Sequence, residues 1–212
     1  LVMYGENQAE YGNCIEDNKN PLMNMSFFSI DNPLEMKFGG LKMSEIINKY
    51  NFTKQDFAPY IPPNIDGLVS SGVEVHYLGY YTKWDPQECY YYAVDNTGFK
   101  ANTERTQGSY SKYSSIDDKI DPFHYYTTLI KFGIGRATYD ASQEIRNGKI
   151  TREEGIHLVR KYDTEFPEKY FKEFLEYIDT TEEQFWQTIN NFRSEHLWQF
   201  KNNQWHLRHK IH

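Results

Sequence analysis

The chain has 212 residues, 39% hydrophobic and 25% charged, which is enough for one large domain or two small ones whose cores need no disulfides. Its formal net charge of −7 argues against a nucleic-acid partner, because such partners usually require a basic surface. The two cysteines, Cys14 and Cys89, form no disulfide framework and favour a cytoplasmic location, and no apolar run reaches the ~18 residues of a membrane helix.

A short strand is expected at the start of the chain. The run LVMY (1–4) is apolar and ends at Gly5, which is typical of a buried strand in a parallel sheet. The residues that follow, up to about 40, are rich in Asn and Met and carry the turn residues of irregular loops. Because the strand is cut in at its beginning, we infer that the first strands of its domain lie upstream.

The middle of the chain alternates helix and strand signals. A helical stripe runs through 41–50, and strand composition with alternating valines marks 71–81. The next helix has Asp85 at its cap, a proline at its first position and Gly98 at its end. Residues 99–115 are expected to be polar loop.

The last part of the chain, from about residue 118, is predicted to be helical. Gly133 and Gly135 should kink or break the first of these helices. Capping boxes predict two later helix starts, one at Thr151 with Glu154 and one at Thr180 with Glu183. Two tryptophans, Trp198 and Trp205, are expected to pin the tail to the body.

One candidate site is the turn that follows the first strand. In α/β proteins a turn after a parallel strand is where ligand-binding groups lie. Glu6 and Asn7 would supply a carboxylate and an amide there. An ordinary surface turn explains the same residues equally well.

A second candidate site is the polar stretch SKYSSIDDKID (111–121). Ser114, Ser115, Asp117 and Asp118 fit two interpretations. They can cap a helix, or the N–H groups of a helix start can bind phosphate between the flanking lysines 112 and 119. The paired aspartates would also suit Mg²⁺ beside a nucleotide.

Arg136 follows the two glycines on an apolar helix, where an unpaired charge is costly. A salt bridge to Asp140 or Glu144 explains it. The alternative is a bidentate contact to a phosphate or carboxylate of a ligand. A tyrosine-rich cluster around 77–92 could likewise stack sugars or simply pack with its hydroxyls at a wet edge.

Four segments carry a resemblance to a known family. They are MYGENQAEYGN, HYLGYYTKWDPQECYYYAVDNTGF, YSKYSSIDDKIDPFHYYTTLIKFGIGRATYDASQEIRNGKITREEG and RKYDTEFPEKYFKEFLEYI. The chain resembles the C-terminal part of the N-acetyl sugar amidotransferases, which are pyrophosphatase-loop ATP-dependent enzymes. The match spans nearly the whole chain.

The resemblance implies an α/β fold in two parts. Residues 1–40 would be the C-terminal strand and loops of a parallel-sheet nucleotide-binding domain of the adenine nucleotide alpha hydrolase-like type. Residues 41–212 would form a mainly helical domain. The Ser-Gly-Gly-x-Asp-Ser type pyrophosphate loop of such enzymes is not among the 212 residues, so no unaided catalysis is expected.

The resemblance also implies a reaction, in which a sugar acetamido group becomes an acetamidino group during lipopolysaccharide or flagellar sugar synthesis. ATP with Mg²⁺ would activate the amide, and a glutaminase partner would supply ammonia. The substrate would be a nucleotide-linked or acidic sugar; a homo-oligomer is possible, and no membrane is expected as a partner.

The expected site residues fall into two groups. The catalytic candidates are Asp117, Asp118 and Lys119. The candidates for substrate or nucleotide binding are Glu6, Asn7, Lys112, Ser114, Ser115 and Arg136. A non-catalytic helical module that binds a glycan or docks the glutaminase is the alternative function.

Overall fold

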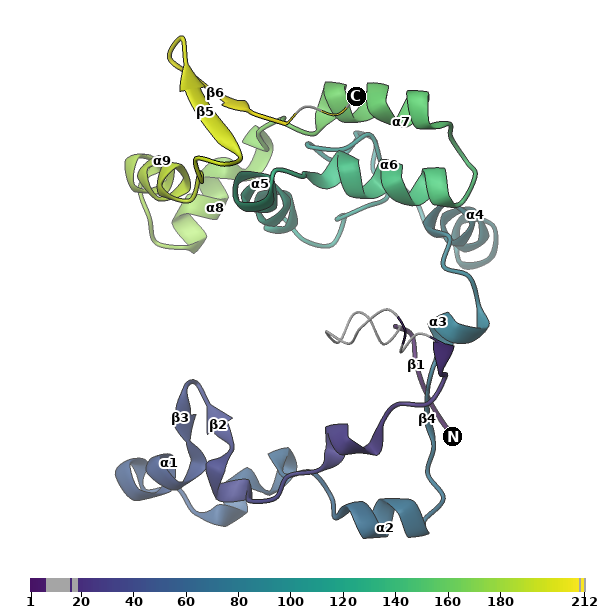
Figure 1. Ribbon diagram of the computed structural model, residues 1–212, viewed down its shortest axis with the longest axis vertical. Coiled ribbons are helices and arrows are strands. Elements are labelled where there is room, and N and C mark those ends of the chain that lie inside the picture. Colours follow the sequence, from purple (N-terminus) through teal and green to yellow (C-terminus); the bar gives the residue numbers. More distant parts are fainter. Residues whose placement is uncertain (7–15, 17–18, 210, 212) are drawn as a thin grey trace. The chain divides into compact units, whose positions relative to one another are not determined.

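The computed structural model describes residues 1–6, 16, 19–209 and 211 (Figure 1). The chain forms two compact units, Leu1–Trp84 and Asp85–His212, which we call the N-terminal and C-terminal units. Both contain helices and small sheets, so the chain is mixed α/β. Residues 41–84 group with the N-terminal segment, whereas the sequence predicts a boundary near residue 40.

The N-terminal unit is built from short elements. They are β1 (Val2–Tyr4), η3 (Met25–Phe28), η4 (Pro33–Glu35), β2 (Lys37–Phe38), β3 (Leu41–Lys42), α1 (Met43–Tyr50), η5 (Lys54–Tyr60), α2 (Ile65–Ser70), β4 (Val75–Tyr77) and α3 (Leu78–Tyr81). The helix expected at 41–50 is thus confirmed as α1. The strand expected at 71–81 is shorter than predicted, because its last four residues form the helical turn α3.

Strands β1 and β4 pair in parallel, with Val2 opposite Val75 and Tyr4 opposite Tyr77. The parallel strand expected at the start of the chain is confirmed, but its burial is not. Val2 and Met3 are 43% and 44% exposed, because a two-stranded sheet leaves much of its surface uncovered. The nucleotide-binding remnant therefore stays a prediction.

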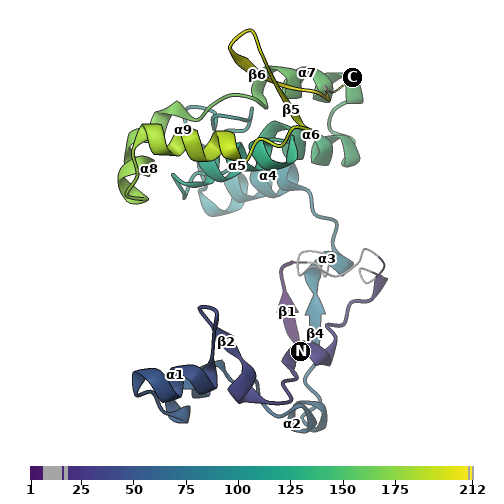
Figure 2. The same ribbon diagram turned by 60° about the vertical axis from the view of Figure 1, so that its left-hand side comes forward.

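The C-terminal unit is mainly helical. It contains α4 (Pro86–Thr97), α5 (Asp121–Phe132), α6 (Arg136–Arg146), α7 (Arg152–Tyr162), η6 (Glu168–Tyr170), α8 (Phe171–Tyr177), α9 (Glu182–Asn191), β5 (Trp198–Lys201) and β6 (Gln204–Leu207). Figures 1 and 2 both show α6 and α7 side by side. None of the helices in the described part of the chain has the length and apolar character to span a bilayer.

The expected helix boundaries are largely confirmed. The Asp85 carboxylate accepts a hydrogen bond from the Glu88 N–H at 3.2 Å, and Gly98 ends α4 with a φ of 72°. Gly133 ends α5 with a φ of 78°, a conformation that glycine adopts without a steric penalty. The last capping box is shifted by one residue from the prediction. It pairs Thr181 with Gln184 instead of Thr180 with Glu183.

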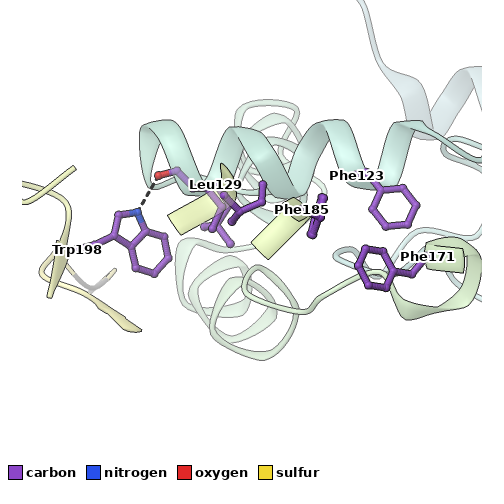
Figure 3. Packing of buried hydrophobic residues seen from close by; sticks show 7 residues of the cluster. Phe123, Leu129, Phe171, Phe185 and Trp198 are labelled. Carbon is purple, nitrogen blue, oxygen red and sulfur yellow. Dashed lines mark hydrogen bonds between the residues drawn. The ribbon is translucent and has the colours of Figure 1, made fainter. Parts of the chain in front are cut away.

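Helix α5 lies at the centre of the hydrophobic core of the C-terminal unit (Figure 3). The buried members of the core are Phe123, Leu129, Ile130, Phe171, Phe185, Ile189 and Trp198. The ring of Phe123 stacks on Phe174, with centroids 4.1 Å apart and planes at 9°. Burying a large apolar side chain contributes ~1.5–3 kcal/mol, so this core holds α5, α8 and α9 together.

The tail folds back as the hairpin β5–β6, which Figure 2 shows in the C-terminal unit. Its turn residues Asn202 and Asn203 have φ values of 52° and 64°, which suits a two-residue hairpin turn. The indole N–H of Trp198 donates to the carbonyl of Ile130 at 2.8 Å, drawn as a dashed line in Figure 3. Trp198 therefore anchors the tail, as expected, while the hairpin itself was not predicted.

Candidate functional site

A cleft of about 970 Å³ lies in the C-terminal unit, between the loop that precedes α5 and the segment from α7 to η6. We call it the loop cleft. Five of the nine predicted site residues line it, namely Lys112, Ser115, Asp117, Asp118 and Lys119. The structure thus brings the core of the second candidate site together.

Short polar contacts shape the loop. The hydroxyl of Ser111 accepts hydrogen bonds from the N–H groups of Tyr113 and Ser114, at 3.3 and 3.2 Å. The hydroxyl of Thr106 donates to the Ser114 carbonyl at 2.7 Å. Ser115 then adopts a positive φ of 54°, which turns the chain toward α5. Serine and threonine favour such turns because their hydroxyls replace backbone partners.

A bidentate ion pair joins the loop before α5 to the segment between α7 and η6. Both terminal nitrogens of Arg105 donate to the carboxylate of Glu165 at 2.6 Å. The same carboxylate accepts the N–H of Gly108 at 2.8 Å. The hydrogen bonds from Arg105 hold the pKa of Glu165 below its usual value. Because Glu165 already neutralises its charge, Arg105 lines the cleft but contributes little to binding an anionic ligand.

The lysines of the loop cleft differ in their pairing. Lys119 Nζ lies 2.6 Å from a Glu173 carboxylate oxygen, and Lys169 Nζ lies 3.1 Å from Glu104. Hydrogen bonding to these carboxylates raises the pKa of both amino groups. The side chain of Lys112 has no ionic partner among the described residues. Its charge is thus available to an anion. The exposed ion pair of Lys119 contributes little stability, so Lys119 can also leave Glu173 to bind an anion.

The two aspartates of the loop cleft also differ. Oδ1 of Asp118 accepts the Ile120 N–H at 2.6 Å, just before α5. The Phe123 N–H donates to the Ile120 carbonyl at 2.9 Å, and Pro122 has no backbone N–H. Asp118 therefore closes a turn just before α5, and few N–H groups at the start of α5 remain for phosphate. No partner is described for the Asp117 carboxylate, which is exposed.

Arg136 lies outside the lining of the loop cleft. Its Nε donates to Asp140 at 3.0 Å, its Nη1 lies 3.6 Å from Asp121, and its guanidinium stacks 4.1 Å from the Tyr125 ring centre. Of the two interpretations of Arg136, the structure shows the internal salt bridge to Asp140. Its contact with a ligand stays a prediction.

The network around Arg136 continues to the cleft. Asp121 also accepts the hydroxyl of Ser115, which lines the cleft, and Asp140 accepts the hydroxyl of Ser109. Burial raises the pKa of Asp140, although Arg136 opposes this shift. The chain of contacts connects the cleft rim to the buried end of α6.

The other predicted residues are placed differently. Ser114 donates to Ser111 at 2.9 Å and does not line the loop cleft. Glu6 is exposed and belongs to the N-terminal unit, whereas the cleft belongs to the C-terminal unit. Asn7 lies outside the described residues.

Sequence reasoning missed several residues of the cleft, namely Glu104, Arg105, Tyr162, Lys169 and Tyr170. Residues 99–115 show only polar loop composition, so nothing in that stretch marks Arg105. Lys169 lies in the segment RKYDTEFPEKYFKEFLEYI, whose resemblance to the family gave no role to any single residue. Only the fold brings these side chains to the predicted aspartates.

Comparison with known families now identifies the chain. The family model described as "LPS biosynthesis protein WbpG-like, C-terminal domain" matches residues 107–212. The chain belongs to this family. The WbpG-like domain includes α5 to β6 and the predicted residues from Lys112 to Arg136. No curated protein matches the chain.

The family match confirms the resemblance expected from the sequence, at the level of a C-terminal part of a lipopolysaccharide-biosynthesis family. It places this WbpG-like chain in lipopolysaccharide biosynthesis. Most of the loop cleft lies inside the matched residues, and Arg105 lies just before them.

Proposed function

We propose that the chain is the C-terminal part of an ATP-dependent amidotransferase of lipopolysaccharide or flagellar sugar biosynthesis. It converts the acetamido group of a nonulosonic or uronic sugar to an acetamidino group, with ammonia from a glutaminase partner. The observation that carries the proposal is the loop cleft, in which Lys112 and Lys119 lie with Asp117 and Asp118 in a WbpG-like domain.

The charges of the loop cleft suit a nucleotide-linked or acidic sugar. Lysines 112, 119 and 169 can neutralise phosphate or carboxylate oxygens, and the aspartates can accept hydrogen bonds from sugar hydroxyls. A volume of about 970 Å³ lies in the range of small-molecule sites. The cleft thus supports binding of the sugar substrate more directly than cleavage of ATP.

Mg²⁺ would come to the loop cleft with the nucleotide. Among the described residues, no three His, Cys, Asp or Glu side chains gather to hold a metal. The neighbouring Asp117 and Asp118 fit the usual magnesium arrangement of one or two carboxylates plus substrate phosphates. ATP supplies the chemistry that turns a poor leaving group, the amide oxygen, into a phosphate ester.

The proposed reaction balances as follows. The acetamido oxygen attacks the α-phosphorus of ATP, and pyrophosphate leaves. Ammonia then adds to the amide carbon, loses its excess protons, and displaces AMP with the former amide oxygen. The residues of this chain would hold the sugar and orient its acetamido group, since positioning supplies much of such an acceleration.

Calorimetric titration of the 212-residue chain tests the proposal. We expect UDP-N-acetylglucosamine with Mg²⁺ to bind, and Lys112→Gln or Lys119→Gln to weaken binding by roughly threefold or more. Lys172→Gln is the matched control, because Lys172 lies on α8 outside the cleft and is 92% exposed. Equal affinity in all three variants would contradict the site.

A second candidate function is a non-catalytic module that binds a glycan. Helix α4 carries two exposed tyrosines, Tyr91 and Tyr92, which are 57% and 68% exposed. Exposed aromatic rings can stack on sugars. Binding of a neutral oligosaccharide that is lost in Tyr92→Ala, without any response to nucleotides, would favour this function.

A further inference from the structure

Arg193 carries a positive charge that no carboxylate neutralises within the described part of the chain. Its Nε lies 3.3 Å from the amide oxygen of Asn190, and its Nη2 lies 3.5 Å from the Tyr126 hydroxyl. Nη1 is buried, and none of the described residues accepts a hydrogen bond from it. An unsatisfied buried donor costs ~1–3 kcal/mol, so such a group calls for an explanation.

Two tryptophans frame this guanidinium. Its carbon lies 4.2 Å from the ring centre of Trp198 and 5.5 Å from that of Trp205. Trp198 is held in place by its hydrogen bond to Ile130. Burial lowers the pKa of Arg193, because the charge has lost water without gaining an acid. The side chain is thus a positioned cation on an aromatic support.

Arg193 lines a second pocket of about 650 Å³, which we call the tryptophan pocket. Tyr126, Arg160, Trp198, Trp205 and His206 also line it. A volume of this size holds a small molecule. The tryptophan pocket and the loop cleft share no lining residue, so they are separate sites.

The charge that the tryptophan pocket offers a ligand is positive. Arg160 and Arg193 line it, and the acid described there, Asp163, is already engaged. The Asp163 carboxylate accepts three hydrogen bonds, from the N–H of Gly135 at 2.9 Å and from the N–H and hydroxyl of Thr138 at 2.8 Å. With two arginines against this one carboxylate in the described lining, the pocket favours an anion.

We propose that the tryptophan pocket binds a small ring compound, of sugar size, that carries an oxyanion. The guanidinium of Arg193 would take the oxyanion, since its donors match carboxylate and phosphate groups. Trp205 would cover the apolar face of the ring, and His206 would provide a further hydrogen bond. This site goes beyond the proposed amidotransfer and does not rest on it.

Tryptophan fluorescence of the 212-residue chain tests this proposal, because two of its four tryptophans line the pocket. Glucuronate and glucose 6-phosphate are titrated in parallel with glucose. We expect saturable quenching by at least one anionic sugar and none by neutral glucose. Whichever anionic sugar binds with the higher affinity shows whether the pocket prefers carboxylate or phosphate.

Variants locate the binding site. Arg193→Gln should weaken binding by about tenfold or more, and Arg193→Lys by less, since lysine keeps the charge but loses the planar fork. Lys201→Gln removes one charge from the exposed end of β5, and Lys172→Gln removes one from the exposed face of α8; neither residue lines the tryptophan pocket or the loop cleft. Both controls should stay within about twofold of the parent affinity.

Folding is checked by near-ultraviolet circular dichroism. If Arg193→Gln does not fold, His206→Gln takes its place, with an expected loss of about threefold. The proposal is overturned if glucose quenches as strongly as the anionic sugars. It is also overturned if no anionic sugar gives a saturable signal, or if the pocket variants match Lys201→Gln in affinity. Arg193 would then be a structural stacking contact alone.

Discussion

Asp163, at the end of α7, caps α6 through Thr138, whose N–H and hydroxyl both donate to its carboxylate at 2.8 Å. The N–H of Gly135 adds a third bond at 2.9 Å. Asp163 is only 7% exposed, so this cap is protected from water. A residue of one helix therefore fixes the start of its neighbour.

Replacement of Asp163 by asparagine should destabilise the C-terminal unit. The neutral amide accepts fewer bonds and buries an NH₂ group where N–H donors already converge. We expect a loss of about 1–3 kcal/mol in the free energy of unfolding, measured by urea denaturation. The control Asp95→Asn changes an exposed residue of α4 and should cost under about 0.5 kcal/mol. An equal effect of both variants would contradict the cap.

Gly135 should tolerate no side chain. A Cβ atom there would lie 2.6 Å from the backbone oxygen of Asp163, which cannot move away without breaking the cap. Gly135→Ala should thus cost about 1–3 kcal/mol. At Gly155 a Cβ would also lie 2.6 Å away, but from Cδ1 of Ile145, the end of a flexible side chain.

Gly155→Ala should therefore be the milder of the two glycine changes, and part of its cost is offset by alanine's better helix propensity, ~1 kcal/mol. Thermal unfolding of the two variants compares them directly. A larger loss for Gly155→Ala would show that the Ile145 side chain is less adaptable than the Asp163 backbone.

The pair of Arg105 and Glu165 predicts a pH dependence. Arg105 holds the pKa of Glu165 below its usual range, so the folded state binds this proton less readily than the unfolded state. The pair's stabilisation is then fully present above the usual glutamate pKa, about 4.3, and is lost as the pH falls through the lowered value.

The Glu165→Gln variant should lose that stabilisation at neutral pH. The difference between its urea midpoint and that of the parent should shrink between about pH 5 and about pH 3. A difference that stays constant over this range would show that the effect of the substitution is not electrostatic.

Trp198 should stabilise the C-terminal unit through its indole N–H hydrogen bond as well as through its buried apolar area. Trp198→Phe leaves the Ile130 carbonyl without this donor in the core and creates a small cavity, for an expected loss of about 2–4 kcal/mol. The matched control is Trp186→Phe, whose N–H bonds the exposed Glu182 carboxylate at 3.2 Å. Because water can replace that bond, the control should cost less in thermal denaturation.

The sequence by itself determined the local features of this protein. Helix ends at Asp85, Gly98, Gly133 and Thr151 were predictable because a cap depends on residues within four positions along the chain. The polar stretch 111–121 was recognised as a candidate site because its serines, aspartates and lysines are neighbours in the sequence. Its family resemblance was readable in the order of the residues.

Only the tertiary structure decided which distant residues meet. The ion pair of Arg105 and Glu165 joins residues 60 positions apart. It places Arg105 in the lining of the loop cleft, which no sequence motif predicts. For Arg136 the sequence left a salt bridge and a ligand contact open; Asp140 lies four residues along the same helix, and packing of α5 against α6 added Asp121 as a second acid. Such contacts depend on how helices pack, which short-range patterns do not encode.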